Sequence, residues 1–279
     1  MREDASMRGA GDPALEAALA LLLRQRQPAL AGLSGVPGSG KSTFAAALER
    51  LAASRGVGLL VLTLDDFYLT RDARQRLARE VHPLLATRGV PGTHEIELLG
   101  EVLAALPAAS PARPVRVPRF DKGRDTRLPP SRWRRVERPP DIMLLEGWCV
   151  GVPPQPAAAL ATPCNTLERE EDADGRWRRW VNAQLAGPYA SLWRELEGLI
   201  VLQAPGFEVV RGWRAEQERP RLAQAAPHAL DDATLERFLM HYERLGRHAL
   251  RSLPARADLC IVLDRERRVQ AIRPSPAAR

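Results

Sequence analysis

The segment GVPGSGKST, residues 35–43, has the residue types and spacing of a loop that binds phosphate groups. It fits the pattern GxxxxGK[ST], whose glycines allow backbone N–H groups to converge on phosphate oxygens. A helix predicted to begin near Lys41 adds the positive end of its dipole to the same place. We expect Lys41 to reach the β- and γ-phosphates of a nucleotide and Ser42 to place its hydroxyl on Mg²⁺. Thr43 also suits a packing or capping role. The candidate nucleotide-binding residues are Gly35, Pro37, Gly38, Ser39, Gly40, Lys41, Ser42 and Thr43.

Acidic residues follow two other apolar runs of the sequence. Asp65 and Asp66 come at the end of one run, in LTLDDFYLT, and Glu146 comes at the end of another, in IMLLEGW. Ligands of an open parallel sheet bind beyond the carboxyl ends of its strands, so these acids should lie near the phosphate-binding loop. Phosphoryl transfer needs one carboxylate near the metal and another near the attacking hydroxyl. The two motifs supply both, although Asp66 by itself is equally compatible with a helix cap or a solvated acid.

Lysine is rare in this chain. Of the 41 basic residues only Lys41 and Lys122 are lysines, and every other positive charge is an arginine. An ammonium group is a compact point charge that the planar guanidinium of arginine cannot replace in a tight site. Lys41 lies in the phosphate-binding loop, and Lys122 lies in VRVPRFDKGRDTR, which two proline-rich stretches enclose. This segment is too short for a domain but suits a loop on the substrate side of a site.

The elements that must position these residues alternate along the chain. Continuous apolar runs predict strands that are covered on both faces, and helical patterns lie between them. The alternation predicts an α/β fold with a mainly parallel sheet. The predicted strands are 29–33, 58–64, 142–145, 199–202 and 259–263, and the predicted helices are 42–53, 72–81, 94–106, 176–196 and 232–251. In the last helix an apolar stripe is expected to belong to the core: Leu235, Phe238, Leu239, Tyr242 and Leu245.

Length and composition exclude several classes of protein. The 279 residues, 45% of them apolar, suffice for one core, and no apolar run approaches the ~18 residues that a membrane span needs. The first 27 residues mix acids and bases, which favours a surface helix over a secretory signal. Three widely spaced cysteines argue against a disulfide framework or a zinc cluster and favour the cytoplasm. The net charge of +7 is scattered, which favours small anionic ligands over nucleic acid.

The sequence resembles a known family, the plant-type P-loop D-glycerate 3-kinases, which are related more distantly to phosphoribulokinase, uridine kinase and bacterial pantothenate kinase. The resemblance covers most of the chain from Gly35 onward, and its motifs occur in the order that the family uses. The matching segments are GVPGSGKST, LTLDDFYLT, HPLLATRGVPGTHEIELL, VPRFDKGRDTR, IMLLEGW, PYASLW and WRAEQE.

The resemblance implies the fold and the reaction. The expected fold is the P-loop NTPase three-layer sandwich, formed by residues 1–279 as a single kinase domain with acceptor-side and lid segments at about 66–135 and 205–230. The expected reaction is Mg²⁺- and ATP-dependent phosphorylation of a small anionic hydroxy acid. Asp65 is then the base, Glu146 the acid near Mg²⁺ and Arg214 a residue of a mobile lid. The motif positions facing the acceptor are Asp66, Tyr68, Arg88, His94, Arg119, Asp121 and Lys122.

The acceptor is the part of this interpretation with alternatives. A carboxylate such as that of glycerate favours a clamp by Arg119 or Lys122. Phe120 stands where the family is expected to have tyrosine, and the segment after Lys122 is shorter than in the plant enzymes. The alternatives are a kinase for pantothenate, a nucleoside or another sugar acid, and a non-catalytic ATP-binding module. A regulatory GTPase and a transporter ATPase are excluded, because the chain contains neither an NKxD nor an LSGGQ-type motif.

Overall fold

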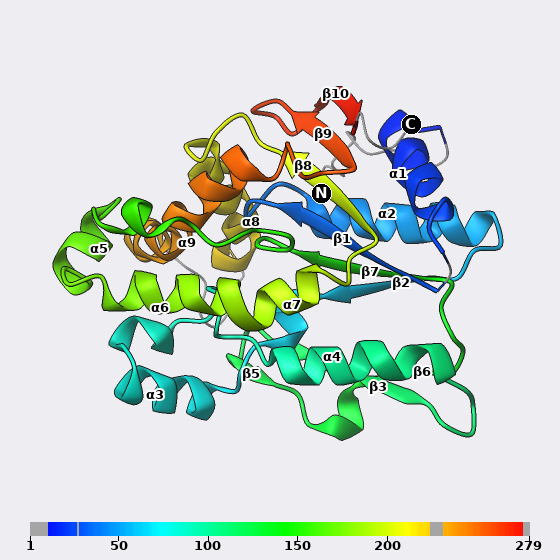
Figure 1. The fold of residues 1–279 in the computed structure, drawn as a ribbon, viewed down its shortest axis with the longest axis horizontal. Coiled ribbons are helices and arrows are strands. Elements are labelled where there is room, and N and C mark those ends of the chain that lie inside the picture. Colours follow the sequence, from blue (N-terminus) through cyan, green and yellow to red (C-terminus); the bar gives the residue numbers. More distant parts are fainter. Residues whose placement is uncertain (1–10, 27, 224–230, 276–279) are drawn as a thin grey trace.

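A six-stranded sheet forms the centre of the computed structural model, which describes residues 11–26, 28–223 and 231–275 (Figure 1). The strand order is β10-β9-β8-β1-β7-β2, and only β10 runs antiparallel to its neighbour. The five parallel strands are those that the sequence predicts, whereas the partly exposed β10 has no continuous apolar run to reveal it. Their bounds are β1 (Ala29–Gly35), β2 (Leu59–Thr63), β7 (Ile142–Gly147), β8 (Gly198–Gln203), β9 (Leu259–Leu263) and β10 (Val269–Pro274).

Helices cover both faces of the sheet, as expected for a three-layer α/β fold. On one face α1 (Pro13–Leu23) and α2 (Lys41–Ser54) pack against the strands, and their apolar side chains join one core cluster (Figure 1). The helix expected near the N-terminus is α1, which buries Leu15, Leu19 and Leu22 against the sheet and leaves Ala20 and Leu23 exposed. The second core cluster lies on the other face and takes side chains from α4 (Ile96–Ala105), α7 (Ala190–Trp193), α8 (Val209–Ala223) and α9 (Asp232–Ser252).

Two predicted helices differ from the observed ones for local reasons. The helix predicted from residue 94 begins at Ile96, because His94 instead forms an isolated antiparallel bridge with Tyr68. The helix predicted over 176–196 is divided into α6 (Arg176–Gln184), a π-turn and α7, since Gly187 has non-helical dihedrals and Pro188 follows it. The remaining helices are α3 (Arg71–Glu80) and α5 (Thr166–Glu171).

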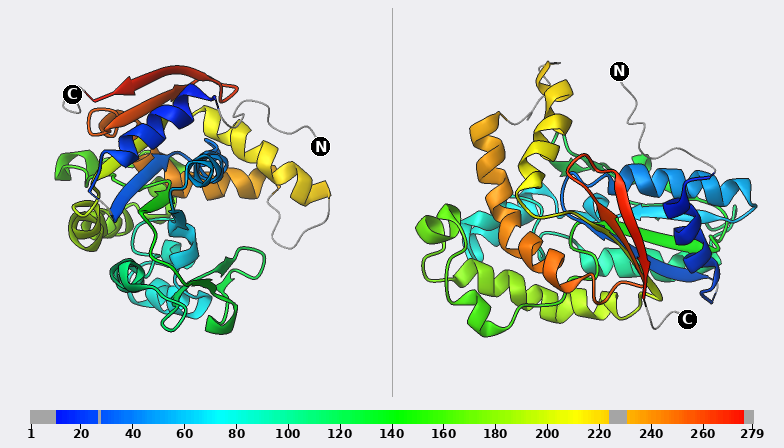
Figure 2. Two further views of the ribbon diagram at one scale, coloured as in Figure 1. Left: turned by 90° about the vertical axis from the view of Figure 1, so that its right-hand side faces the viewer. Right: turned by 90° about the horizontal axis from the view of Figure 1, so that it is seen from above.

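Two small antiparallel sheets lie outside the central one, on the side of the molecule that also holds α3 and α4 (Figure 2). They are β3 (Val115–Val117) with β6 (Arg134–Val136), and β4 (Phe120–Asp121) with β5 (Thr126–Arg127). The β4–β5 hairpin carries Lys122 in its four-residue loop. This arrangement explains how VRVPRFDKGRDTR forms an ordered appendage to the sheet without a core of its own.

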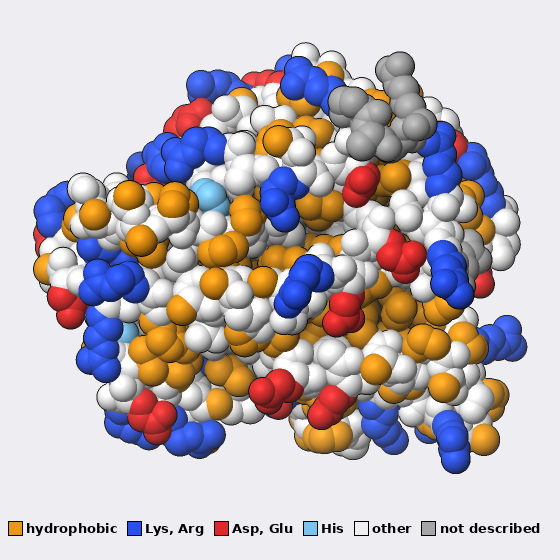
Figure 3. All heavy atoms as spheres, viewed as in Figure 1, with side chains coloured by type: hydrophobic (Ala, Val, Ile, Leu, Met, Phe, Trp, Pro, Cys, Tyr) orange, Lys and Arg blue, Asp and Glu red, His pale blue; other side chains and the backbone are white. Residues whose placement is uncertain are grey.

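Charged side chains of both signs alternate over the face seen in Figure 3, where no broad basic surface forms. Across the described part of the chain, no helix combines the length and the apolar character needed to cross a bilayer.

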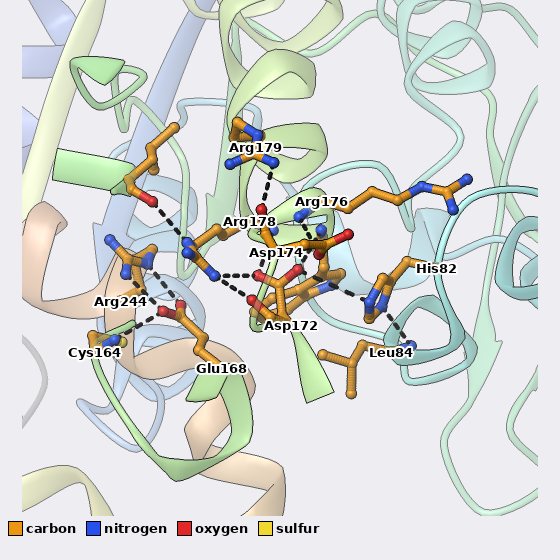
Figure 4. Close-up of polar contacts among 12 residues, drawn as sticks. His82, Leu84, Cys164, Glu168, Asp172, Asp174, Arg176, Arg178, Arg179 and Arg244 are labelled. Atoms are coloured by element: carbon orange, nitrogen blue, oxygen red, sulfur yellow. Dashed lines mark hydrogen bonds and ion pairs between the residues drawn. The ribbon is translucent and has the colours of Figure 1, made fainter. Parts of the chain in front are cut away.

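Buried ion pairs connect α5, α6 and α9 (Figure 4). Arg178 pairs with Asp172 at 2.9 Å, and Arg244 pairs with Glu168 at 2.6 Å. The carboxylates are fully buried, and both guanidiniums also donate to backbone carbonyls of residues 159–162. Because every charge has a partner, the network fixes α9 against α5 and α6.

Removing one charge from this network should destabilise the fold. We expect Glu168→Gln to lower the free energy of unfolding by about 3–5 kcal/mol, because it leaves Arg244 without its buried carboxylate. Glu171→Gln, one turn away on α5, breaks only an exposed pair with Arg237 and should cost no more than about 1 kcal/mol. Urea unfolding of both variants measures the difference, and equal losses would contradict this account of the network.

Candidate active site

A pocket opens where the central strands end, and it contains most of the residues that the motifs single out. The loop after β1, the end of β7, the residues after β2, and the helices α8 and α9 all contribute to its lining. Its lining includes Pro37, Gly38, Gly40, Lys41, Ser42, Thr43, Asp65, Tyr68, Arg88, Lys122, Glu146, Gly147, Trp148, Arg214, Gln217, Glu218, Phe238 and Tyr242.

The phosphate-binding loop requires glycine at two of its positions. Gly38 and Gly40 have φ values of +83° and +88°, in the left-handed region that other residues avoid. A Cβ on Gly38 would also lie 2.7 Å from the Cβ of Trp213, so this glycine lets α8 approach the loop. The hydroxyl of Ser39 is buried, and no hydrogen-bond partner for it occurs in the part of the chain that the structure describes. The loop therefore offers unfilled donors and a helix N-terminus to an anion.

Lys41 begins α2 and lies beside the carboxylates of the pocket. Its Nζ donates a hydrogen bond of 3.2 Å to the carbonyl of Val36. Burial lowers the pKa of Lys41, while the nearby carboxylates of Glu146 and Asp65 oppose that effect. The position suits a cation that meets the terminal phosphates of a nucleotide.

Glu146 accepts hydrogen bonds from two hydroxyls, one on α2 and one at the end of β2. Its Oε1 accepts from the Oγ of Ser42 at 3.0 Å and from the Oγ1 of Thr63. Thr63 ends β2 and stands opposite Glu146 in the register of β2 and β7. Sequence analysis did not single out Thr63, although it lies in the predicted strand 58–64, two residues before the predicted site acid Asp65. Within the described ranges no group of three or more histidines, cysteines or acids could hold a metal. A Mg²⁺ ion at a nucleotide site is usually held by one or two carboxylates together with phosphate oxygens and water.

Asp65 is a partly buried carboxylate of the pocket, with its side chain 28% exposed. Its Oδ2 accepts from the Nζ of Lys122 at 2.7 Å, and its Oδ1 accepts from the hydroxyl of Tyr68 at 2.9 Å. Burial raises the pKa of Asp65, but the charge and hydrogen bond of Lys122, the imidazole of His94 and the Tyr68 hydroxyl outweigh it, so the pKa lies well below its ordinary value. The group is therefore ionised throughout the neutral range.

Asp66 and His94 do not line the pocket but contact residues close to it. The Oδ1 of Asp66 accepts from the backbone N–H of Phe120 at 2.8 Å, and burial raises the pKa of this carboxyl. The ring of His94 stacks on that of Tyr68 with centroids 4.5 Å apart, and its Nδ1 lies 2.6 Å from the Tyr189 hydroxyl. Burial lowers the pKa of His94 to about 4, so the imidazole is neutral at pH 7.

Besides Asp66 and His94, two further residues of the predicted acceptor set do not line the pocket. Arg119 is exposed, and its carbonyl accepts from the backbone of Leu128. Asp121 accepts hydrogen bonds from the backbone N–H groups of Gly123 and Arg124, which is how an aspartate stabilises a tight turn. The structure brings Arg88, Tyr68 and Lys122 to the pocket and places Arg119 and Asp121 at its outer side.

The helices α8 and α9 contribute Arg214, which the resemblance implies for the site, and residues that sequence analysis assigned elsewhere or missed. Arg214 reaches the pocket from α8 and pairs with Glu218 at 2.8 Å, with Gln217 also accepting from it at 2.7 Å. Phe238 and Tyr242 were expected to be core only, yet both also line the pocket. Their apolar stripe could not reveal this, because one face of a helix can cover both a core and a cavity. Residues 224–230 of the predicted lid segment lie outside the described residues.

Comparisons with known proteins place the chain among kinases. No family model matches it. It is 32% identical over 223 residues to the uncharacterized kinase mug58 of Schizosaccharomyces pombe, an alignment that covers 77% of this chain and 79% of the relative. It is 30% identical over 259 residues to the probable ATP-dependent kinase TDA10 of Saccharomyces cerevisiae, covering 85% and 84%. Identity to the chloroplastic D-glycerate 3-kinase of Arabidopsis thaliana is 29%, covering 77% of this chain and 46% of the plant protein.

Solved structures agree on the fold. A D-glycerate 3-kinase from Cryptococcus neoformans superimposes with a TM-score of 0.74 at 22% identity, covering 95% of this chain and 100% of that one. The YGR205w protein superimposes with a TM-score of 0.73 at 25% identity, covering 95% and 99%. With the motifs and the pocket already described, these relatives show that the chain is an ATP-dependent phosphotransferase acting on an alcohol group and belongs to the family of P-loop D-glycerate 3-kinases and their fungal relatives.

Proposed function

We propose that the chain transfers the γ-phosphoryl group of ATP to D-glycerate and yields 3-phosphoglycerate. The observation that carries the proposal is the ionised Asp65, fixed by Lys122 at 2.7 Å in the same pocket as Lys41 and the phosphate-binding loop. A carboxylate so placed can meet an acceptor hydroxyl beside the terminal phosphate. The choice of glycerate is supported by the names of the plant and Cryptococcus relatives.

Asp65 is the proposed base. It accepts the proton of the acceptor hydroxyl as that oxygen attacks, and its second oxygen keeps the hydrogen bond from Tyr68 or Lys122. The tight pairing makes it a weak base but keeps it ionised and oriented. Since phosphoryl transfer depends mainly on positioning and electrostatic stabilisation, orientation contributes more here than basicity does.

The residues present fit ATP and Mg²⁺. The loop from Gly35 to Thr43 would hold the phosphates, with left-handed Gly38 and Gly40 opening its backbone and Lys41 supplying a positive charge. Ser42 and Glu146 would hold the cation, and Thr63 orients the Glu146 carboxylate toward Ser42. When bound, Mg²⁺ neutralises the charge that develops on the phosphates. Arg214, now paired with Glu218, is the candidate for a further positive charge from α8.

A cytoplasmic location is part of the proposal. Cys149, Cys164 and Cys260 are all free thiols, which suits a reducing compartment.

A panel of acceptors tests the proposed function. Purified enzyme with Mg·ATP is offered D-glycerate, L-glycerate, pantothenate and uridine, and ADP release is measured. We expect release with D-glycerate and a 3-phosphate rather than a 2-phosphate product in phosphorus NMR. If pantothenate or uridine is phosphorylated and D-glycerate is not, the proposed substrate is wrong, but the chain is still a kinase. Tight ATP binding with every acceptor inert would favour a non-catalytic ATP-binding module.

Two substitutions separate the proposed roles of the acids. Asp65→Asn should lower kcat by about 10²–10⁴ with the KM for ATP nearly unchanged, because a base acts on the acceptor hydroxyl and not on the nucleotide. Glu146→Gln should instead raise the Mg²⁺ concentration needed for half-maximal rate. The exposed Asp72 on α3 provides the control Asp72→Asn. A metal defect in the Asp65 variant together with a pure rate defect in the Glu146 variant would exchange the two roles.

A further inference from the structure

One cluster of charges at the pocket carries more positive than negative charge. Asp125 lies between two arginines: its Oδ1 accepts from Nη1 of Arg88, and its Oδ2 accepts from Nη2 of Arg74 at 2.7 Å. We propose that Arg88 binds the carboxylate of the hydroxy-acid acceptor and that Asp125, held by Arg74, is the positioning residue that fixes the Arg88 guanidinium. This inference rests on the function proposed above.

Lys41 belongs to the phosphate-binding loop, and among the other cations that line the pocket the pairing of charges distinguishes Arg88. Lys122 is paired with Asp65 at 2.7 Å, and Arg214 is paired with Glu218 at 2.8 Å, so each of these charges already faces one acid. Arg88 and Arg74 share a single carboxylate. The cluster therefore keeps one net positive charge, and its pocket-facing member is Arg88, whose side chain is 22% exposed. A guanidinium is also the group best matched to a carboxylate.

Arg74 acts as the fixed end of this cluster. Its side chain is only 1% exposed, although it is an arginine on a surface helix, α3. Besides the carboxylate, its guanidinium donates to the carbonyl of Ala86 at 2.9 Å and to that of Asp125 at 3.1 Å. These bonds connect α3, the segment before Arg88 and the β4–β5 loop. Asp125 is thus fixed from its buried side and presents its other oxygen to Arg88.

Further contacts restrict Arg88 to one place. Its guanidinium carbon lies 5.7 Å from the centre of the Phe120 ring, and its carbonyl accepts from the Tyr242 hydroxyl at 3.1 Å. The next residue, Gly89, has a φ of +134°, and a Cβ there would overlap with the Tyr242 hydroxyl. The backbone at Gly89 tolerates only glycine. Its close packing against Tyr242 fixes the backbone of Arg88 relative to α9.

The β4–β5 loop connects the proposed clamp with the proposed base. Lys122 at its start pairs with Asp65, and Asp125 at its end pairs with Arg88. Only two residues therefore separate the contact that fixes the base from the contact that fixes the carboxylate. This loop would set the distance between the reacting hydroxyl and the carboxylate of the acceptor, which is what distinguishes one hydroxy acid from another.

A double-mutant cycle tests the inference. The variants are Arg88→Ala, Asp125→Asn and the two combined, with Arg124→Gln as a control because Arg124 is 76% exposed in the same loop. We expect Arg88→Ala to raise the KM for D-glycerate by roughly 10- to 100-fold and Asp125→Asn by roughly 3- to 10-fold, with the KM for ATP unchanged. The double variant should be no worse than Arg88→Ala, because Asp125 acts through Arg88. Methyl D-glycerate lacks the negative charge, so its KM should change little in either single variant.

The outcomes separate the inference from the function on which it depends. If wild-type enzyme phosphorylates D-glycerate while Arg88→Ala leaves its KM unchanged, the clamp is overturned and the function stands. If the two increases in KM multiply in the double variant, or if the KM for the methyl ester rises equally, the positioning role of Asp125 is overturned. Thermal unfolding of each variant identifies a merely structural loss, which would lower kcat for both acceptors together. If wild-type enzyme leaves D-glycerate unchanged, the proposed function fails and the inference fails with it.

Discussion

A carboxylate that must stay charged while it is partly buried beside a phosphate-binding loop is the constraint on which the site depends. Partial burial raises the pKa of Asp65, and a protonated acid could not accept a proton from an acceptor. The ammonium of Lys122 at 2.7 Å and the hydroxyl of Tyr68 at 2.9 Å keep it ionised. Because Lys122 comes from the β4–β5 loop, the chemistry at the end of β2 depends on an appendage outside the central sheet.

The central sheet and the helices position the other residues of the site in different ways. Parallel register brings Thr63 of β2 opposite Glu146 of β7, so the hydroxyl that orients this carboxylate is placed by the strands themselves. The lining that comes from α8 and α9 is not placed by strand register. The position of α9 depends instead on the buried pairs of Glu168 with Arg244 and Asp172 with Arg178, far along the chain from the motifs. Stability of that network is therefore a condition for the shape of the site.

The part of the site that follows strands directly could be predicted from the sequence. Lys41, Asp65 and Glu146 each lie within a contiguous motif at the end of an apolar run, so local pattern and sheet geometry suffice to bring them together. Asp65 and Asp66 show the limit of that reasoning, because adjacent acids of one motif point to different partners, Lys122 and the Phe120 backbone.

Contacts between distant segments could not be predicted from pattern alone. Arg119, Asp121 and Lys122 share one motif, yet the turn after β4 sends only Lys122 into the pocket. Asp125 gave no signal, since its importance lies in two arginines 37 and 51 residues away. Phe238 and Tyr242 followed the periodicity of a core helix, which does not distinguish a side chain that meets the core from one that meets a cavity. Strand β10 was missed because a partly exposed edge strand has no apolar run.

The pH dependence of kcat/KM in wild-type enzyme and in Lys122→Ala tests the central claim most directly. In wild type the pKa of Asp65 lies well below its ordinary value, so acidification should not protonate this base in the range where the enzyme stays folded. In Lys122→Ala the effect of burial, which raises the pKa, remains, and the largest opposing charge is gone. The account predicts that activity of this variant falls on acidification at a higher pH than in wild type, while Arg124→Gln keeps the wild-type profile. Superimposable profiles for wild type and Lys122→Ala would contradict it.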